Sequence, residues 1–220
     1  IAMPEEGQII YAKNSSTVKN SELKGQSVKD FLAAVEAAKA NERKTIKSTD
    51  IVAYASPEGP EKFNNELSDS RSNSAQKAFN KVTKKAPIDA PVNVKSVGED
   101  WEGFQALVAN SNLEDKDLIL RVLSMYSDPA VREQEIRNMS AVYTTLAKDV
   151  LPGLRRARFI ANVEFTNYSS EELLKLVDEN IDVLDEEALL RAATLVKCEN
   201  KVAIYKKAIE KYSSARAQYN

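Results

Sequence analysis

Residues 50 to 72 read Asp-Ile-Val-Ala-Tyr-Ala-Ser-Pro-Glu-Gly-Pro-Glu-Lys-Phe-Asn-Asn-Glu-Leu-Ser-Asp-Ser-Arg-Ser, and this stretch decides the fold. The apolar run 50–55 predicts a strand, and the Pro and Gly residues after it predict a loop. Pro60 then opens a helix that we expect to reach about Lys84. Four side chains of that helix are spaced i, i+3, i+4 and i+7, so they share one face: Asn64, Leu67, Ser68 and Arg71.

Further strands and helices are expected on both sides of this stretch. Residues 8–12 and 91–97 predict strands, the second from its alternation of valines with polar neighbours. The polar residues 13–26 predict a loop. Ser27 is expected to cap a helix over 27–41, with Asp30 in the capping-box position. Apolar residues of the helix that begins at Pro60 form a stripe that we expect to face the core: Phe63, Leu67, Ala75, Ala78, Phe79 and Val82.

The second half of the chain is mostly helical in its pattern. Residues 101–152 predict helices, one of which starts at the Asp128 cap with Pro129 in its first position and runs through Tyr143. Residues 154–165 read Leu-Arg-Arg-Ala-Arg-Phe-Ile-Ala-Asn-Val-Glu-Phe and predict the last strand. By the period-2 alternation of strands, at least one of its arginines should point outward.

The tail reads as a set of short helices. The run Ser169-Ser170-Glu171-Glu172 is a capping box, Asp185 caps a second helix, and a third runs from about Lys201. Residues 215–220 look like the start of another helix, so we expect the natural protein to continue beyond Asn220. Because the chain starts at Ile1 and shows no signal peptide, we also expect a processed or trimmed piece.

The composition excludes several classes of function. The 220 residues carry a net charge of -2, so no global basic field attracts nucleic acid. No apolar run approaches the ~18 residues of a membrane span. The absence of histidine excludes Ser-His-Asp and Cys-His catalysis and histidine zinc sites. The single cysteine, Cys198, is expected to be a small buried residue. No nucleotide motif occurs and no carboxylate constellation points to catalysis, so we expect no enzyme, cofactor or metal.

The strand, loop and helix of residues 50–72 together resemble the signature of the OmpA-like, peptidoglycan-associating domain. In that family a Gly-His-Thr-Asp-type segment precedes an Asn-x-x-Leu-Ser-x-x-Arg-Ala-type helix at the spacing found here. The strand with Arg155 and Arg156 resembles the family's final Asn-Arg-Arg-Val-Glu-like strand. The helical insert and the Ala-Ser-Pro-Glu-Gly loop are similar to OmpA-like proteins of the Bacteroidetes type.

This resemblance implies an α+β fold and a domain organisation. We expect a β-α-β-α-β core over residues 1–167, with a helical insert at about 101–152 before the last strand. Residues 168–220 then form an all-helical tail. Tyr205 and Ala208 stand where a tetratricopeptide repeat has a large aromatic and a small residue, so the tail resembles one degenerate repeat.

The resemblance also implies a ligand site. The family binds the diaminopimelate of the peptidoglycan stem peptide, whose end carries an ammonium and a carboxylate. The site residues carried over are Ser56, Glu58, Asn64, Leu67 and Arg71. Arg71 would take the carboxylate through its planar fork. The family's Asp is Ser56 here, and a hydroxyl does not neutralise an ammonium. Glu58, two residues on, is the candidate replacement.

Three interpretations of this site stay open. In the first, Glu58 replaces the missing Asp and the chain binds peptidoglycan. In the second, Arg71 binds an altered stem peptide or another carboxylate. In the third, the ligand is lost, Arg71 lies on a solvated helix face or in an internal salt bridge, and Asn64, Ser68 and Leu67 have structural roles.

Two functions follow from these interpretations. One is a non-catalytic envelope protein on the periplasmic face of the outer membrane that anchors to peptidoglycan. The other is an interaction scaffold whose helical tail recruits a protein partner. The arginines of the last strand are expected to brace the sheet edge or the loop of the site.

Overall fold

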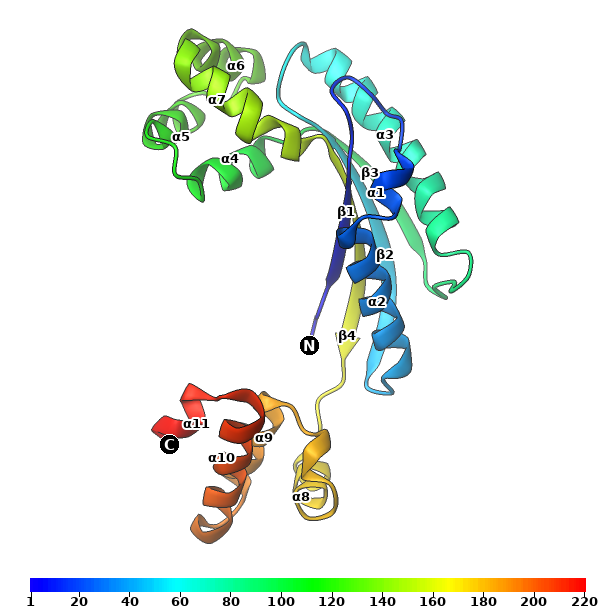
Figure 1. The fold of residues 1–220 in the computed structure, drawn as a ribbon, viewed down its shortest axis with the longest axis vertical. Coiled ribbons are helices and arrows are strands. Elements are labelled where there is room, and N and C mark those ends of the chain that lie inside the picture. Colours follow the sequence, from blue (N-terminus) through cyan, green and yellow to red (C-terminus); the bar gives the residue numbers. More distant parts are fainter. The chain divides into compact units, whose positions relative to one another are not determined.

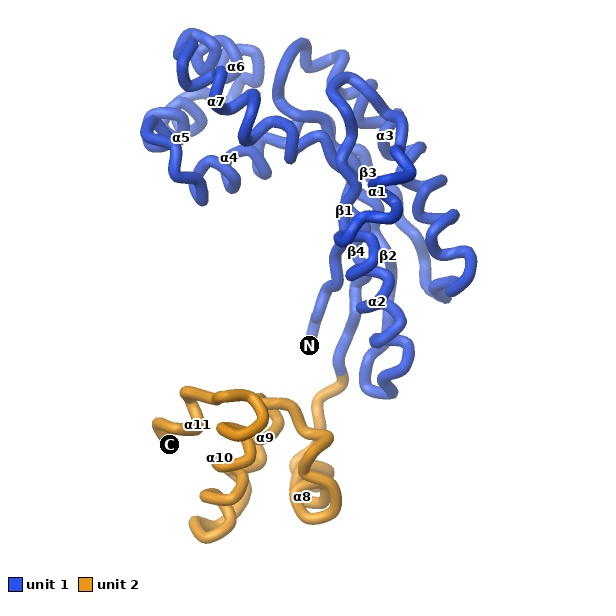
Figure 2. The backbone as a smooth tube through the Cα atoms, in the orientation of Figure 1, with its two compact units in different colours: residues 1–165 blue, residues 166–220 orange.

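The computed structural model describes residues 1–220 and is of the α+β class, as predicted. The chain divides into two compact units, Ile1–Phe165 and Thr166–Asn220 (Figure 2). The elements of the first unit are β1 (Glu5–Ile10), α1 (Asn20–Leu23), α2 (Gln26–Ala40), β2 (Lys44–Ala55), α3 (Glu61–Val82), β3 (Val92–Glu99), α4 (Trp101–Ala109), α5 (Lys116–Met125), α6 (Pro129–Asn138), α7 (Ser140–Asp149), the 3-10 turn η1 (Leu151–Leu154) and β4 (Arg156–Phe165).

The first unit is built on a four-stranded mixed sheet in the order β1-β4-β2-β3 (Figure 1). β4 lies between β1 and β2 and is antiparallel to both, with Phe159 opposite Gly7 on one side and Ile51 on the other. β2 and β3 run parallel, and their register shifts between Ala53 and Ala55. The last strand in the sequence is therefore an inner strand of the sheet. The residue just before it, Arg155, is thus placed between the ends of β1 and β2.

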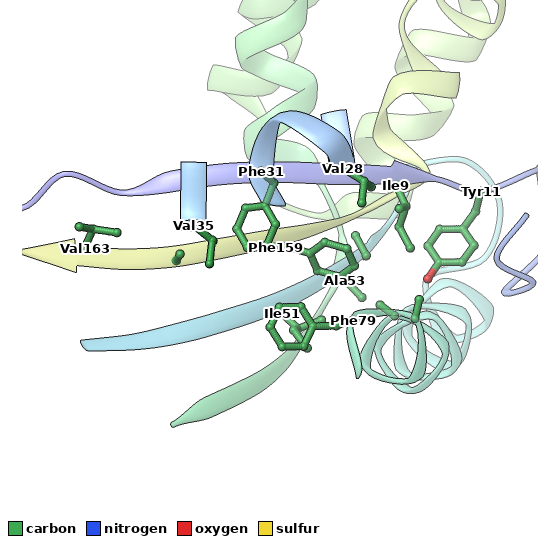
Figure 3. Packing of buried hydrophobic residues seen from close by; sticks show 14 of the residues in the cluster. Ile9, Tyr11, Val28, Phe31, Val35, Ile51, Ala53, Phe79, Phe159 and Val163 are labelled. Carbon is green, nitrogen blue, oxygen red and sulfur yellow. The ribbon is translucent and has the colours of Figure 1, made fainter. Parts of the chain in front are cut away.

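The hydrophobic core lies between the sheet and the helices α2 and α3 (Figure 3). Side chains of β4 alternate between buried and half-buried positions, as a strand with one covered face requires. Phe159 is fully buried and its ring packs against Phe31 of α2 and Phe79 of α3, at centroid distances of 6.0 Å and 5.5 Å. These contacts hold both helices on the same face of the sheet.

Two predictions about the helices of this layer are wrong. The N-cap of α2 is Gly25, and no side chain caps it. The Ser27 hydroxyl instead accepts a hydrogen bond from the backbone N–H of Gln8 in β1, so it ties the helix to the sheet. In α3, Phe63 is 43% exposed because it lies about three turns before Ala75, where the helix begins to pack on the core. Leu67 is half-buried and lies outside the core cluster, so only the later part of the stripe packs inward, with Ala75, Ala78 and Phe79 buried.

The insert between β3 and β4 folds around a core of its own. Ten buried residues from α4, α5, α6, α7, η1 and the junction at Val150 form this cluster, with Phe104, Ile119 and Leu146 almost fully buried. Asp128 caps α6 by accepting from the N–H of Val131, as predicted. The single helix expected through Tyr143 is two helices, because the chain breaks at Met139 between α6 and α7.

The second unit contains α8 (Ser170–Glu179), the 3-10 turn η2 (Ile181–Val183), α9 (Glu186–Leu195), α10 (Cys198–Tyr212) and α11 (Ala215–Tyr219). The capping box at Ser169 and the Asp185 cap are both present, as predicted. Fully buried Leu173, Leu184 and Leu189 pack in its core. The prediction that Cys198 is buried is wrong, because it is the first residue of α10 and lies exposed.

None of the helices has both the length and the apolar character that crossing a membrane requires.

Candidate ligand site at the loop between β2 and α3

The candidate site is the short loop that joins the end of β2 to the start of α3. Its Glu58 is only 7% exposed, and its carboxylate accepts a 2.9 Å hydrogen bond from the hydroxyl of Ser56. Gly59 has a φ of 85°, which glycine adopts without strain, so the chain turns sharply here. The carboxylate of Glu58 is thereby brought next to the side chain of position 56.

Cations surround the Glu58 carboxylate. Arg155, the residue just before β4, donates to Oε1 from Nε at 3.1 Å and forms a salt bridge from its terminal nitrogen at 3.0 Å. The ammonium of Lys13 lies 3.7 Å from Oε2, which is too far for a hydrogen bond. Oε2 is buried and has no hydrogen-bond partner. The expectation that an arginine of the last strand region braces this loop is confirmed by Arg155.

Arg71 lies in the interior of the fold rather than on a solvated helix face. Its side chain has no exposed surface, and it is the largest of the fully buried side chains. Its guanidinium donates to three backbone carbonyls, those of Ser15 at 2.9 Å, Tyr54 at 3.0 Å and Ala12 at 3.2 Å. The loop before α1 therefore folds over this guanidinium.

No carboxylate forms a salt bridge with Arg71, although buried charges in proteins are usually paired. Its closest aromatic contact is Tyr11, whose ring centroid lies 5.0 Å from the guanidinium carbon. Burial lowers the pKa of Arg71 to about 10, and the charge of Arg155 acts in the same direction. Tyr11 and, to a smaller extent, the negative charge of Glu58 act on the pKa of Arg71 in the opposite direction.

The other predicted side chains of α3 have different positions. Asn64 is buried and donates to the Glu58 carbonyl at 3.0 Å and to the Glu99 carboxylate at 2.8 Å. The Ser68 hydroxyl donates to the carbonyl of Ala53 and accepts from the N–H of Gly98. Leu67 is half-buried and lies outside the core cluster. The helix face that carries Asn64 and Ser68 therefore forms hydrogen bonds that connect α3 to β2, to β3 and to the loop.

Several residues of the site carry no sequence signal. Glu99 accepts from Asn64 and from the indole N–H of Trp101, and burial raises its pKa despite these hydrogen bonds. Tyr11 and Lys13 come from a strand end and a loop that precede the signature by about forty residues. Only the fold brings them to Arg71 and Glu58.

No group of three or more Cys, Asp or Glu side chains is placed to bind a metal ion. The charged side chains near the loop include the cations Lys13, Arg71 and Arg155 and the carboxylates Glu58, Glu99 and Glu133. A scan against protein-family models finds no match, and a search of curated proteins finds no similar sequence.

Proposed function

We propose that the chain is a non-catalytic cell-envelope protein whose first unit is an OmpA-like domain that binds the diaminopimelate of peptidoglycan. It would anchor to the cell wall from the periplasmic face of the outer membrane. The observation that carries the proposal is a pair of incompletely partnered buried groups, one on α3 and one in the loop before it. Arg71 is a buried cation without a carboxylate, and Oε2 of Glu58 is a buried anion without a hydrogen-bond donor.

A diaminopimelate end group carries a carboxylate, which Arg71 lacks as a partner, and an ammonium, which would donate a hydrogen bond to Oε2 of Glu58. Its carboxylate would replace backbone carbonyls on the planar fork of Arg71, and charge-assisted hydrogen bonds are roughly twice as strong as neutral ones. Its ammonium would take the place of the distant Lys13 at Oε2 of Glu58. The hydrogen bond from Ser56 to Glu58 supports this role, because it holds a carboxylate beside the position of the family's Asp.

Binding requires the site to open. The carbonyls of Ala12 and Ser15 occupy donors of Arg71, so the loop that carries them has to move before a carboxylate reaches the guanidinium. We propose that this loop also has an open arrangement, and a ligand shifts the population toward it only by its preference for that arrangement. The affinity is therefore reduced by the cost of opening.

The organisation of the chain is consistent with the proposal. The element order is β-α-α-β-α-β, then the helical insert, then the strand β4 and the helices of the second unit, and this order supports the proposal. We propose that the second unit is a tetratricopeptide-like segment for a protein partner, since Ala208 is fully buried beside the larger Tyr205 in one helical hairpin.

Calorimetric titration with a synthetic stem peptide tests the proposal. The matched ligand control is the same peptide with lysine in place of diaminopimelate, which keeps the ammonium and lacks the carboxylate. We expect saturable binding of the diaminopimelate peptide and at least tenfold weaker binding of the lysine peptide, because loss of an ion-pair partner costs about 2 to 5 kcal/mol. Equal affinities for the two peptides would contradict a role for Arg71.

A second candidate function is an interaction scaffold with no peptidoglycan ligand. The observation in its favour is that Arg71 has no exposed surface and that Glu58 already pairs with Arg155. On this account the former ligand groups hold the loops together, and the tail recruits the partner. No heat with either peptide at millimolar concentration would support it, and binding of simple carboxylates alone would indicate a different ligand for Arg71.

A further inference from the structure

We infer that Glu133, on α6 of the helical insert, is a positioning residue that holds the Ser56–Gly59 turn and so sets the place of the Glu58 carboxylate. The inference deepens the proposed function, because it rests on Glu58 as the group that receives the ligand ammonium. It gives the insert a role in the site, which neither the signature of residues 50–72 nor the composition indicates.

The first contact between the insert and the loop is apolar. Pro57 lines a small pocket with side chains of the insert core, together with Glu133 at its rim. The apolar lining residues of that pocket are Trp101, Phe104, Ile136, Tyr143, Leu146 and Leu151. Proline has a fixed φ and few rotamers, so docking it into a packed socket fixes the chain direction at low entropic cost.

The second contact is a charge-assisted hydrogen bond. The backbone N–H of Gly59 donates to Oε1 of Glu133 at 2.6 Å. The same oxygen accepts from Arg137 one turn on, at 2.9 Å and 2.7 Å, and Arg137 stacks over the ring of Tyr143 at 5.0 Å. The Glu133 side chain is 17% exposed, so water competes little for its carboxylate. The hydrogen bonds from Arg137 thus fix the orientation of the Glu133 carboxylate toward the loop.

The third contact is made by the residue that ends the insert. Arg155 follows η1 directly, and Leu151 and Leu154 of that turn are buried in the insert core. Arg155 in turn binds the Glu58 carboxylate at 3.0 Å. The insert therefore contacts three consecutive loop residues through a socket, a hydrogen bond and an ion pair.

Glu58 lies between two neighbours that the insert holds. Its own backbone N–H donates to the carbonyl of Ser56 at 2.8 Å, which closes the turn. If Gly59 is released, the turn loses the restraint on its C-terminal side, and the Glu58 carboxylate loses its fixed distance from Arg71. Glu133 acts through this backbone and does not contact the ligand.

Amide hydrogen exchange on the full chain tests the restraint without any ligand. In Glu133→Ala we expect exchange at Gly59 and Glu58 to become about tenfold faster, because a hydrogen bond to a charged group contributes about 1.5 kcal/mol or more. Glu133→Gln should restore slow exchange, since its amide oxygen still accepts from Gly59. The matched control is Glu135→Ala on the same helix, where the side chain makes no hydrogen bond or ion pair. Unchanged exchange at Glu58 in Glu133→Ala would overturn the inference.

A ligand comparison then separates this inference from the proposed function. The probes are a diaminopimelate stem peptide and the same peptide with its free amine acetylated. We expect Glu133→Ala to reduce the preference for the free amine about tenfold, and Glu133→Gln to keep it. An unchanged preference would show that Glu133 does not position Glu58. If the wild-type chain binds neither peptide, the proposed function fails, while the exchange at Glu58 still decides the role of Glu133.

Discussion

Replacement of Arg71 by alanine is the sharpest perturbation of the site. Three backbone carbonyls, those of Ala12, Ser15 and Tyr54, lose their donor when the guanidinium is removed. A buried acceptor left without a partner costs about 1 to 3 kcal/mol. The carbonyls of Ala12 and Ser15 belong to a surface loop that water can reach, so the lower end of that range applies to each. We therefore expect Arg71→Ala to lower the free energy of unfolding by about 3 kcal/mol.

Urea denaturation of the full chain measures this loss, with Arg121→Ala as the matched control. Arg121 lies exposed on α5 and makes no ion pair, so its removal should change stability by less than about 0.5 kcal/mol. Arg71→Lys should fall between the two, because one ammonium cannot serve three carbonyls in the geometry of the planar fork. A loss below about 1 kcal/mol for Arg71→Ala would refute the view that this guanidinium holds the loop before α1 to the end of β2.

Three further predictions concern other parts of the chain. Asn64→Ala removes a hydrogen bond that lowers the pKa of Glu99, so carboxyl NMR titration should show that pKa rise further. Because the pKa of Glu99 is already raised, its contribution to stability is full below the ordinary carboxyl range and is lost as pH rises through the folded value; in Asn64→Ala this loss should extend to higher pH. Phe159→Ala should lower the free energy of unfolding by about 3 to 5 kcal/mol, measured by urea denaturation, because the ring is fully buried between two others. Cys198 should react with a thiol reagent in the native state as fast as in urea, since it is exposed.

For each of these three predictions, one experimental outcome would contradict the physical reason given for it. A Glu99 pKa that stays constant or falls in Asn64→Ala would mean that the hydrogen bond is absent in solution. A cost below about 1 kcal/mol for Phe159→Ala would place that ring outside the core. Protection of Cys198 until denaturation would show that the start of α10 is covered.

Sequence patterns predicted the helix starts correctly where the capping interaction involves only neighbouring residues. The caps at Asp128, Ser169 and Asp185 act within one helical turn, so residue type and spacing were enough. The cap at Ser27 was wrong because its hydroxyl is taken by the N–H of Gln8, 19 residues away. That competition depends on how α2 packs on β1, which no spacing rule contains.

In the candidate site, too, the sequence predicted features that depend on neighbouring residues and missed those that depend on residues far apart in the chain. The spacing of Asn64, Ser68 and Arg71 correctly predicted one shared helix face, because it follows from helix geometry alone. The burial of Arg71 was not predicted, since it depends on a loop that begins nearly sixty residues earlier. The pairing of Glu58 with Arg155 spans 97 residues and needs β4 in the centre of the sheet.

The central claim is that Arg71 exchanges backbone carbonyls for the carboxylate of a diaminopimelate stem peptide. The most direct measurement is the Nε–H resonance of Arg71 in a proton–nitrogen NMR titration with that peptide. The account predicts a saturable shift of this resonance, accompanied by shifts of the backbone amides of the loop before α1 as it moves away. An Arg71 resonance that does not move at millimolar peptide would contradict the account and leave the scaffold function as the better explanation of the fold.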